Sequence, residues 1–245
     1  MSALLWVHYF SSMICGKQKS SLVMQAAISF VKKIYELISY IIAPPFCYAC
    51  RGYMPQRVIL CSKCDHAIEL IVPKMFKINE KYILTVYTVS RYTEPLRPML
   101  FAKYRSDEIV LEKLADIIWQ KSVLSLVQVD YLIPIPLHWS RVVKRGFNQA
   151  ELLANRLSMH SKIPILKCLV RERKTEYQVR VLHGDRTTNI KKSMFATIDT
   201  QKITDKHVVL VDDSCTTGAT ALEAARALVA FKPASINMIV ACRAL

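Results

Sequence analysis

Residues 208–220 read VVLVDDSCTTGAT. The four apolar residues 208–211 predict a buried parallel strand, and Asp212 and Asp213 close it. A short turn of Ser, Cys, Thr and Gly follows and leads into ALEAARAL, which is a good helix former. Adjacent carboxylates repel each other, whereas an opening helix offers free N–H groups and the positive end of its dipole. The stretch therefore suits a ligand that carries hydroxyls, a metal and a phosphate together, and a sugar phosphate with magnesium fits this description.

The same stretch closely resembles the phosphoribosyl pyrophosphate (PRPP) signature of type I phosphoribosyltransferases. The resemblance implies that Asp212 and Asp213 are catalytic residues that hold the ribose hydroxyls. It also implies a loop that cradles the 5′-phosphate, formed by Thr216, Thr217, Gly218, Ala219 and Thr220. Ser214 and Cys215 depart from the pattern, because the family often has apolar residues there. The plainer alternative is an ordinary strand, turn and capped helix, since Asp and Thr also serve turns and N-caps. Binding of a phosphorylated pentose requires an open hollow beside the carboxylates.

Length and composition favour a globular α/β protein with one main domain and a small module. The chain has 245 residues, 52% of them apolar, and shows no internal repeat or low-complexity tract. The formal charge of +15 favours partners rich in phosphate, such as a pyrophosphate substrate, a nucleic acid or an acidic membrane surface. A solvated basic surface is the alternative, and charge alone does not choose among these.

The eight cysteines do not follow the pattern of a secreted disulfide framework. Four of them form two Cys-x-x-Cys pairs separated by ten residues, Cys47 with Cys50 and Cys61 with Cys64. Two such pairs supply a closed tetrahedral set of four thiolates, which suits a structural Zn²⁺ whose binding provides the folding energy of a small segment. Redox-active or merely buried cysteines are the alternative, and His66 could replace one thiolate. A closed site has no coordination place for a substrate, so we assign this zinc no catalysis.

The N-terminal residues lack the features of an export signal. Residues 1–15 are apolar but have no basic leader, no cleavage site and too little length to span a bilayer, so we expect a cytoplasmic protein without a transmembrane segment. Met24 is a candidate natural start, because the resemblance to known proteins begins after it. Over residues 25–42 the apolar side chains recur at three- and four-residue steps, which predicts an amphipathic helix that docks on the next module, on a membrane or on a partner.

Residues 129–149 read VDYLIPIPLHWSRVVKRGFNQ, a buried strand ended by proline, a short basic turn and the start of a helix over 150–160. The turn would lie at the carboxyl edge of the sheet, where α/β proteins bind ligands. The block resembles the signature of the ComF group, the competence-associated branch of the phosphoribosyltransferase fold. The resemblance implies a basic loop that binds pyrophosphate, with Leu137, His138, Trp139, Ser140, Arg141, Lys144 and Arg145. Alternatively, the cations contact a nucleic-acid backbone while Trp139 and Phe147 stack on bases, or Asn148 simply caps the helix.

The segment after a predicted strand over 165–170 is rich in charge and weakly periodic, which fits a loop. Its spacing resembles the ComF pattern and implies a flexible hood that closes over the reacting carbon and excludes water. The implied hood residues are Arg171, Arg173, Lys174, Thr175, Gln178, Arg186 and Asn189. A solvated charged loop is the alternative. Residues 81–90 predict a strand and 96–124 one or two helices, within which Lys103 is either a phosphate contact or a solvated lysine.

Together these resemblances run from about Pro44 to Arg243. They imply an α/β fold, a type I phosphoribosyltransferase-like parallel sheet with helices on both faces, preceded by a small zinc-ribbon module. The expected regions are an extension with an amphipathic helix over 1–43, the zinc ribbon over 44–75 and the phosphoribosyltransferase-like domain over 80–245. The ligand cleft is expected between the strand ends near Pro136 and Asp213.

Three functions are consistent with the sequence. The first is a ComF-like protein that binds PRPP with Mg²⁺ and acts in natural competence, with transfer of phosphoribose to a nitrogen acceptor as the associated chemistry. Such transfer rests on positioning and charge stabilisation and requires no protein nucleophile. The second is a non-catalytic protein that retains the fold and binds single-stranded DNA. The third is a scaffold whose zinc module recruits other competence proteins. No specificity loop for a base is recognisable, so the sequence does not identify the acceptor.

Overall fold

The computed structural model describes residues 29–31, 34, 46–54, 59–101, 107–171 and 194–244. The chain forms two compact units, one made of residues 1–46 and 53–57 and the other of residues 47–52 and 58–245. In the first unit, residues 29–31 and 34 are helical, and the rest of the helix predicted over 25–42 lies outside the described residues. No helix in the described part of the chain has the length and apolar character needed to cross a membrane.

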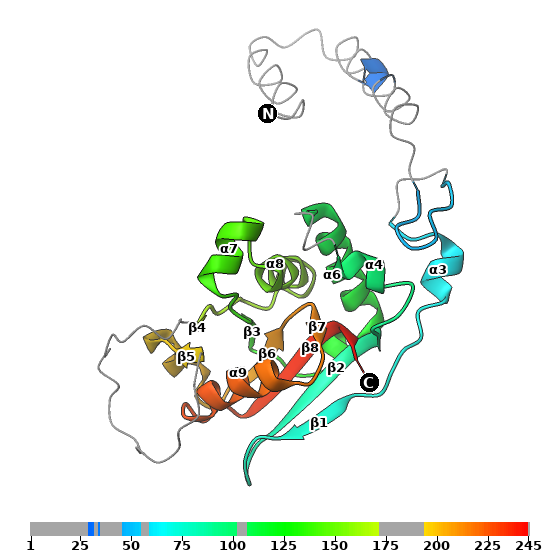
Figure 1. Ribbon diagram of the computed structural model, residues 1–245. Helices are drawn as coiled ribbons and strands as arrows, with labels where there is room; N and C mark the ends of the chain where they lie inside the picture. The colour runs from blue at the N-terminus through cyan, green and yellow to red at the C-terminus, as the bar shows by residue number, and fades with distance from the viewer. Residues whose placement is uncertain are drawn as a thin grey trace, which may run out of the picture. The chain divides into compact units, whose positions relative to one another are not determined.

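The second unit is built around a mostly parallel sheet with the strand order β1-β2-β8-β6-β3 (Figure 1). These strands are β1 (Lys74–Lys77), β2 (Ile83–Arg91), β8 (Ser235–Arg243), β6 (His207–Val211) and β3 (Tyr131–Pro134). The short strand β7 (Ser214–Cys215) also pairs with β8. Only β1 runs antiparallel to its neighbour, while the other pairs in this sheet are parallel. The last strand of the chain, β8, therefore lies inside the sheet between β2 and β6.

Helices cover both faces of this sheet (Figure 1). Helix α9 (Ala219–Val229) packs on one face, and α6 (Glu108–Lys121) and α8 (Gln149–Ser161) lie together on the other. The shorter helices are α3 (Ser62–His66), α4 (Arg97–Leu100) and α7 (Trp139–Arg145), with 3₁₀ turns η1 (Val123–Leu126) and η2 (Ile198–Ile203). A separate antiparallel pair consists of β4 (Leu169–Arg171) and β5 (Met194–Ala196). The predicted parallel sheet with helices on both faces is confirmed.

The apolar run of β6 is explained by burial on both sides. Val208 and Leu210 belong to the core cluster beneath α9, where Ala224 and Ala225 allow the helix to approach the sheet closely. Because side chains alternate along a strand, the buried Val209 faces the opposite layer, toward α6 and α8. A strand that is covered on both faces has no reason to alternate apolar and polar residues.

Two segments differ in detail from their predictions. The basic turn after β3 contains the helix α7, which His138 and Gly146 cap at its two ends. The strand predicted over 165–170 is shorter, because only Leu169–Arg171 forms a strand and Ile165 makes a single bridge to Leu132 of β3. Pro164, which has no N–H to donate, precedes that bridge and limits the ladder.

Candidate functional site

The two acidic residues lie immediately after the central strand β6. Asp213 is 6% exposed, and Ser214 donates a hydrogen bond from its Oγ to Asp213 Oδ1 over 2.9 Å. Asp212 Oδ1 accepts the backbone N–H of Asp213 at 2.8 Å. These local hydrogen bonds orient both carboxyl groups at the carboxyl edge of the parallel sheet.

The turn after the carboxylates opens α9 and leaves donors available. Gly218 is the N-cap residue, and its carbonyl accepts the N–H of Leu222 at 2.8 Å. Thr217 Oγ1 accepts the N–H of Ala219 at 3.3 Å. The N–H groups of Thr220 and Ala221 belong to the first turn and have no intrahelical acceptor. A recess lies here, lined by Asp212, Ser214, Met238 and the turn residues 215–221. The turn is therefore open beside Asp212, as pentose-phosphate binding requires.

Gly218 is needed in this turn for two separate reasons. Its φ of +83° lies in the left-handed region, which strains any residue with a side chain. In addition, a Cβ atom built there would lie 2.6 Å from Cζ of Phe76, a residue of β1. Lys74, two residues earlier on β1, holds its Nζ 5.1 Å from the centroid of the Phe76 ring. The edge strand β1 thus packs against the phosphate-loop turn and brings a cation near it.

A larger recess lies between the ends of β3 and β6. Three arginines line it, Arg141, Arg145 and Arg171, together with the carboxylates of Asp212 and Asp213. Pro136 and Leu137 also line it, as does Gln149 at the start of α8. Asp212, Ser214 and Thr220 line this recess and the smaller one. The two recesses therefore meet at the carboxyl ends of adjacent parallel strands, where they share Asp212.

The basic loop after β3 is held by side-chain hydrogen bonds. His138 Nδ1 accepts the N–H of Ser140 at 3.2 Å and thereby caps α7, which also contains Lys144. Asn148 donates from Nδ2 to the Ile135 carbonyl at 3.1 Å and accepts the N–H of Ala150 at 3.1 Å. Capping of α8 by Asn148, one of the predicted alternatives, is thus confirmed. Trp139 is 57% exposed on α7 and available to a partner.

Several predicted site residues lie outside the described part of the chain. They are Lys103 and the hood residues Arg173, Lys174, Thr175, Gln178, Arg186 and Asn189. Of the predicted hood, Arg171 alone is described; it ends β4 and lines the larger recess.

The structure also adds residues that the sequence did not mark. Gln149 lines the larger recess, although in the sequence it is only the last residue of the block 129–149. Its position directly after the cap residue Asn148 is the one sequence signal for a place at this recess. Phe76 and Lys74 are close to the phosphate-loop turn through the fold alone, because β1 lies far from that turn in sequence.

The thiols near the carboxylates are poorly suited to act as nucleophiles. Burial raises the pKa of Cys215, and the charge of Asp212 acts in the same direction, although Arg243 and Lys74 partly oppose it. Burial also raises the pKa of Cys242 to about 12, with Asp213 adding to the effect. Both thiols are therefore protonated at neutral pH, and they serve as packed side chains.

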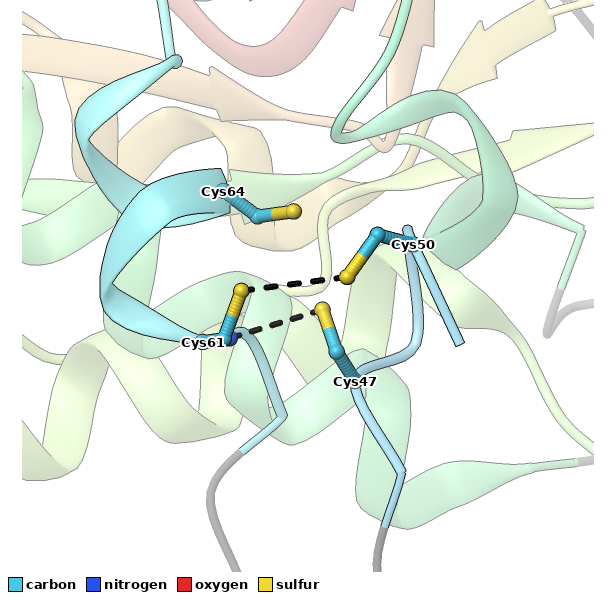
Figure 2. Close-up of side chains that lie close together, drawn as sticks. All are labelled: Cys47, Cys50, Cys61 and Cys64. Atoms are coloured by element: carbon cyan, nitrogen blue, oxygen red, sulfur yellow. Dashed lines mark hydrogen bonds between the residues drawn. The ribbon is translucent and has the colours of Figure 1, made fainter. Parts of the chain in front are cut away.

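The four cysteines of the two Cys-x-x-Cys pairs converge on one point (Figure 2). Their Sγ atoms all lie within 4.8 Å of one another, and those of Cys50 and Cys61 are 3.8 Å apart. A tetrahedral zinc with Zn–S bonds of about 2.3 Å requires sulfur separations of roughly 3.8 Å. The donor set therefore fits a structural Zn²⁺, whose thiolates would come from the turn 47–50 and the start of α3.

Backbone donors favour the thiolate form of Cys47, whereas burial and the neighbouring cysteines raise the pKa of Cys64 to about 12. The N–H of Cys61 donates to Sγ of Cys47 over 3.4 Å. Burial would raise the pKa of Cys47, but the backbone hydrogen bonds from Cys61, Cys50 and Ala49 lower it to about 6. His66 instead places Nδ1 2.7 Å from the Ser62 carbonyl oxygen of its own helix. The cluster is thus composed of four sulfurs without this histidine.

Known proteins resemble this chain in sequence. The family model of the phosphoribosyl transferase domain matches residues 142–245. Competence protein F of Haemophilus influenzae is 31% identical over 147 residues, which cover 57% of this chain and 64% of the relative. DNA utilization protein YhgH of Escherichia coli O6:H1 is 30% identical, covering 64% of this chain and 71% of the relative. Competence protein ComFC of Bacillus subtilis is 28% identical, covering 91% of this chain and 90% of the relative.

These matches confirm the resemblance drawn from residues 129–149 and 208–220. The phosphoribosyl transferase match begins inside α7 and includes the carboxylates and the turn after them. With a sheet that is parallel from β2 to β3, the fold is that of a type I phosphoribosyltransferase-like protein. The chain belongs to the ComF family of competence-related proteins that carry a phosphoribosyltransferase-like domain.

Proposed function

We propose that this protein binds PRPP together with Mg²⁺ and acts in the uptake and processing of DNA during natural competence. The observation that carries the proposal is a pair of recesses that share Asp212, one lined by the turn that opens α9 and the other by Asp213 and three arginines. The names of the relatives, competence proteins and a DNA utilization protein, support the biological setting. The free thiols of the described cysteines are consistent with a cytoplasmic location.

The ribose 5-phosphate half of PRPP would occupy the smaller recess. The 5′-phosphate suits the turn from Thr216 to Thr220, because the unpaired first-turn N–H groups and the helix dipole both favour an anion there. The ribose hydroxyls can donate hydrogen bonds to the carboxylates of Asp212 and Asp213, which line the recesses next to that turn. This assignment orients the sugar with its C1 toward the larger recess.

The pyrophosphate half would then face Arg141, Arg145 and Arg171. Guanidinium groups bind phosphate oxygens with two parallel hydrogen bonds, so this wall would neutralise the leaving group. Magnesium, when bound with PRPP, would be held on the carboxylate side by Asp212 or Asp213, and it would supply charge neutralisation for the pyrophosphate.

If transfer to a nitrogen acceptor takes place, the described residues would contribute positioning and charge. The carboxylates would stabilise positive charge developing at C1, while the arginines stabilise the departing pyrophosphate. Arg171 begins the segment that we propose as the hood, which would exclude water from the reacting carbon. No side chain needs to attack the sugar, in agreement with the raised pKa of Cys215.

Isothermal titration calorimetry with PRPP tests this proposal. We expect binding that requires Mg²⁺ and that falls at least a hundredfold in Asp212→Ala or Asp213→Asn, because the ribose then loses charged acceptors. Asp199→Asn is a matched control, since Asp199 pairs with Lys202 on the surface away from the recesses. Wild-type protein that fails to bind PRPP at millimolar concentration would refute the proposal.

A second candidate function is the binding of single-stranded DNA without phosphoribosyl chemistry. The exposed Trp139 favours it, because an aromatic ring on a basic helix is the arrangement on which bases stack. Neutralising Arg141, Lys144 and Arg145 together should weaken DNA binding and reduce its salt dependence. If the triple variant retains the affinity of the wild type, α7 is not the DNA contact.

For the cysteine cluster we propose a structural Zn²⁺ in a ribbon module that could also recruit other competence proteins. Lys121 of α6 donates to Asp65 Oδ2 of α3 at 3.0 Å, so the second cysteine pair is tied to the α/β core. Metal analysis should find one zinc per chain in the wild type and a substoichiometric amount in Cys47→Ser. Cys168→Ser, which alters a buried thiol outside the cluster, is the control. Full zinc content in Cys47→Ser would reject the assignment of four thiolate ligands.

A further inference from the structure

Gln149 has a buried side-chain amide in which the oxygen has a hydrogen-bond partner and the nitrogen has none among the described residues. The residue is 4% exposed and is the first residue of α8. Its Oε1 accepts a hydrogen bond from Nη1 of Arg145 at 3.1 Å. Its Nε2 is buried and has no hydrogen-bond partner within the described residues. A buried amide donor without an acceptor costs free energy, so its retention requires an explanation.

The contact with Arg145 fixes which way the amide faces. A guanidinium group can only donate hydrogen bonds, so the atom of Gln149 that faces Arg145 must be the oxygen. The NH₂ group of Gln149 therefore points away from Arg145. The donors of the amide are therefore directed to the side away from Arg145.

Gln149 lines the larger recess together with Arg141, Arg145 and the two acidic residues. Besides the carboxylates, the lining offers the guanidinium groups of Arg141 and Arg145 as charged donors, and Gln149 brings an amide beside them. The phosphates of a pyrophosphate group are rich in acceptor oxygens and carry the charge that the arginines favour.

We infer that Gln149 is a specificity residue that donates from Nε2 to a pyrophosphate oxygen of the ligand, with Arg145 holding its amide in the productive orientation. This inference rests on the proposed function and adds a neutral donor to the proposed arginine wall. A neutral donor contributes direction more than charge, so it distinguishes a ligand with a pyrophosphate group from one with ribose phosphate alone.

The test compares Gln149→Met with the wild type by calorimetry, using inorganic pyrophosphate with Mg²⁺ and, separately, ribose 5-phosphate. Methionine has a similar volume and no donor. We expect pyrophosphate affinity to fall roughly tenfold, because a hydrogen bond to a charged acceptor is lost, while affinity for ribose 5-phosphate changes less than twofold. Gln201→Met, at an exposed position of the turn η2, is the matched control and should change neither affinity.

If Gln149 served only the structure, Gln149→Met would make the ligand-free protein less stable than the wild type. Our inference predicts the opposite: because the variant loses a buried amide donor that lacks a partner among the described residues, it should be at least as stable as the wild type in urea unfolding. Gln149→Glu retains an acceptor for Arg145 and lacks the donor, and it should also lose pyrophosphate affinity. This second variant keeps the inference testable if the methionine variant folds poorly.

A double-mutant cycle with Arg141→Met tests whether Gln149 donates independently of an arginine that also lines the recess. Direct donation predicts that the double variant binds pyrophosphate more weakly than Arg141→Met alone. Equal affinities of these two proteins, or unchanged pyrophosphate affinity in Gln149→Met, would overturn the inference and leave PRPP binding intact. Wild-type protein that binds neither pyrophosphate nor PRPP would instead refute the proposed function itself.

Discussion

The two ends of helix α8 carry polar clusters that differ in how completely their hydrogen bonds are satisfied. Near the carboxyl end, Arg156 and His160 converge on Asp116 of α6. Asp116 Oδ1 accepts from Arg156 Nε at 2.6 Å and from His160 Nε2 at 2.8 Å, while Oδ2 accepts from Arg156 Nη2 at 3.2 Å. At the amino end, Gln149 has a buried donor for which the described residues offer no acceptor.

The contrast indicates what each cluster is for. Around Asp116 every oxygen has a cationic partner, and the ring of His160 stacks on Trp119 with 5.9 Å between centroids. Such a closed set joins α6 to α8 and has no capacity left for a ligand. The amino end lines a recess and retains a donor, so it is suited to bind. One helix thus contributes to stability at one end and, in our proposal, to ligand recognition at the other.

The largest expected effect on stability comes from removing the carboxylate of the closed cluster. Asp116→Ala should lower the free energy of unfolding by roughly 2–3 kcal/mol, because it leaves partly buried cations without their acceptor. Calorimetric PRPP affinity should remain that of the wild type. Loss of ligand binding in this variant at a temperature where it is folded would show that the two ends of α8 are coupled.

The pH dependence of unfolding measures what the closed cluster around Asp116 contributes to stability. Burial alone would raise the pKa of Asp116, but Arg156, His160 and Lys113 lower it from 3.8 to about 2. Because the folded-state pKa is the lower one, the contribution is fully present above pH 4 and is lost as the pH falls toward 2. It amounts to roughly 2 kcal/mol. In urea unfolding, the free energy of unfolding of Asp116→Asn should fall less between pH 4 and pH 2 than that of the wild type. An equal fall in both proteins would contradict the role of Asp116.

Substitution of Gly218, at the ligand-binding edge of the sheet, should have a smaller effect on the free energy of unfolding. Gly218→Ala should cost roughly 1–2 kcal/mol of stability, since alanine is strained at positive φ and its Cβ meets Phe76. Combining it with Phe76→Ala removes the steric contact and should recover part of the loss. A strictly additive double variant would mean that the ring does not constrain the turn.

The smallest expected effect concerns the cation at the edge strand. Lys74→Gln should weaken binding of ribose 5-phosphate about twofold to threefold at low salt, as is usual for one exposed charge near an anion site. Lys77→Gln on the same strand is the control, because Lys77 is paired with Glu80 at 2.7 Å. Equal effects of both substitutions would indicate only a general loss of positive charge.

The sequence was informative where local chemistry determines structure. The run 208–211 with the carboxylates after it predicts strand β6 and its position at the ligand edge, because a doubly buried parallel strand requires uninterrupted apolar residues. The cysteine spacing predicts the four-sulfur cluster for a similar reason, since each Cys-x-x-Cys knuckle is a local structure.

Features that depend on long-range packing were not predictable. Phe76 reaches Gly218 only because β1 adds to the sheet edge in antiparallel register with β2, and nothing in residues 74–77 indicates this. The orientation of Gln149 likewise depends on its hydrogen bond with Arg145 across the turn that ends α7. The helix α7 itself was missed, because WSRVVKR has no strong periodicity and its caps, His138 and Gly146, act only in the folded loop.

A crystal structure of the protein grown with PRPP and Mg²⁺ tests the central claim most directly. The account predicts a phosphorylated pentose whose hydroxyls contact Asp212 and Asp213, whose 5′-phosphate lies in the turn from Thr216 to Thr220, and whose pyrophosphate faces Arg141 and Arg145. Ligand density at any other surface, with both recesses filled only by solvent, would contradict it.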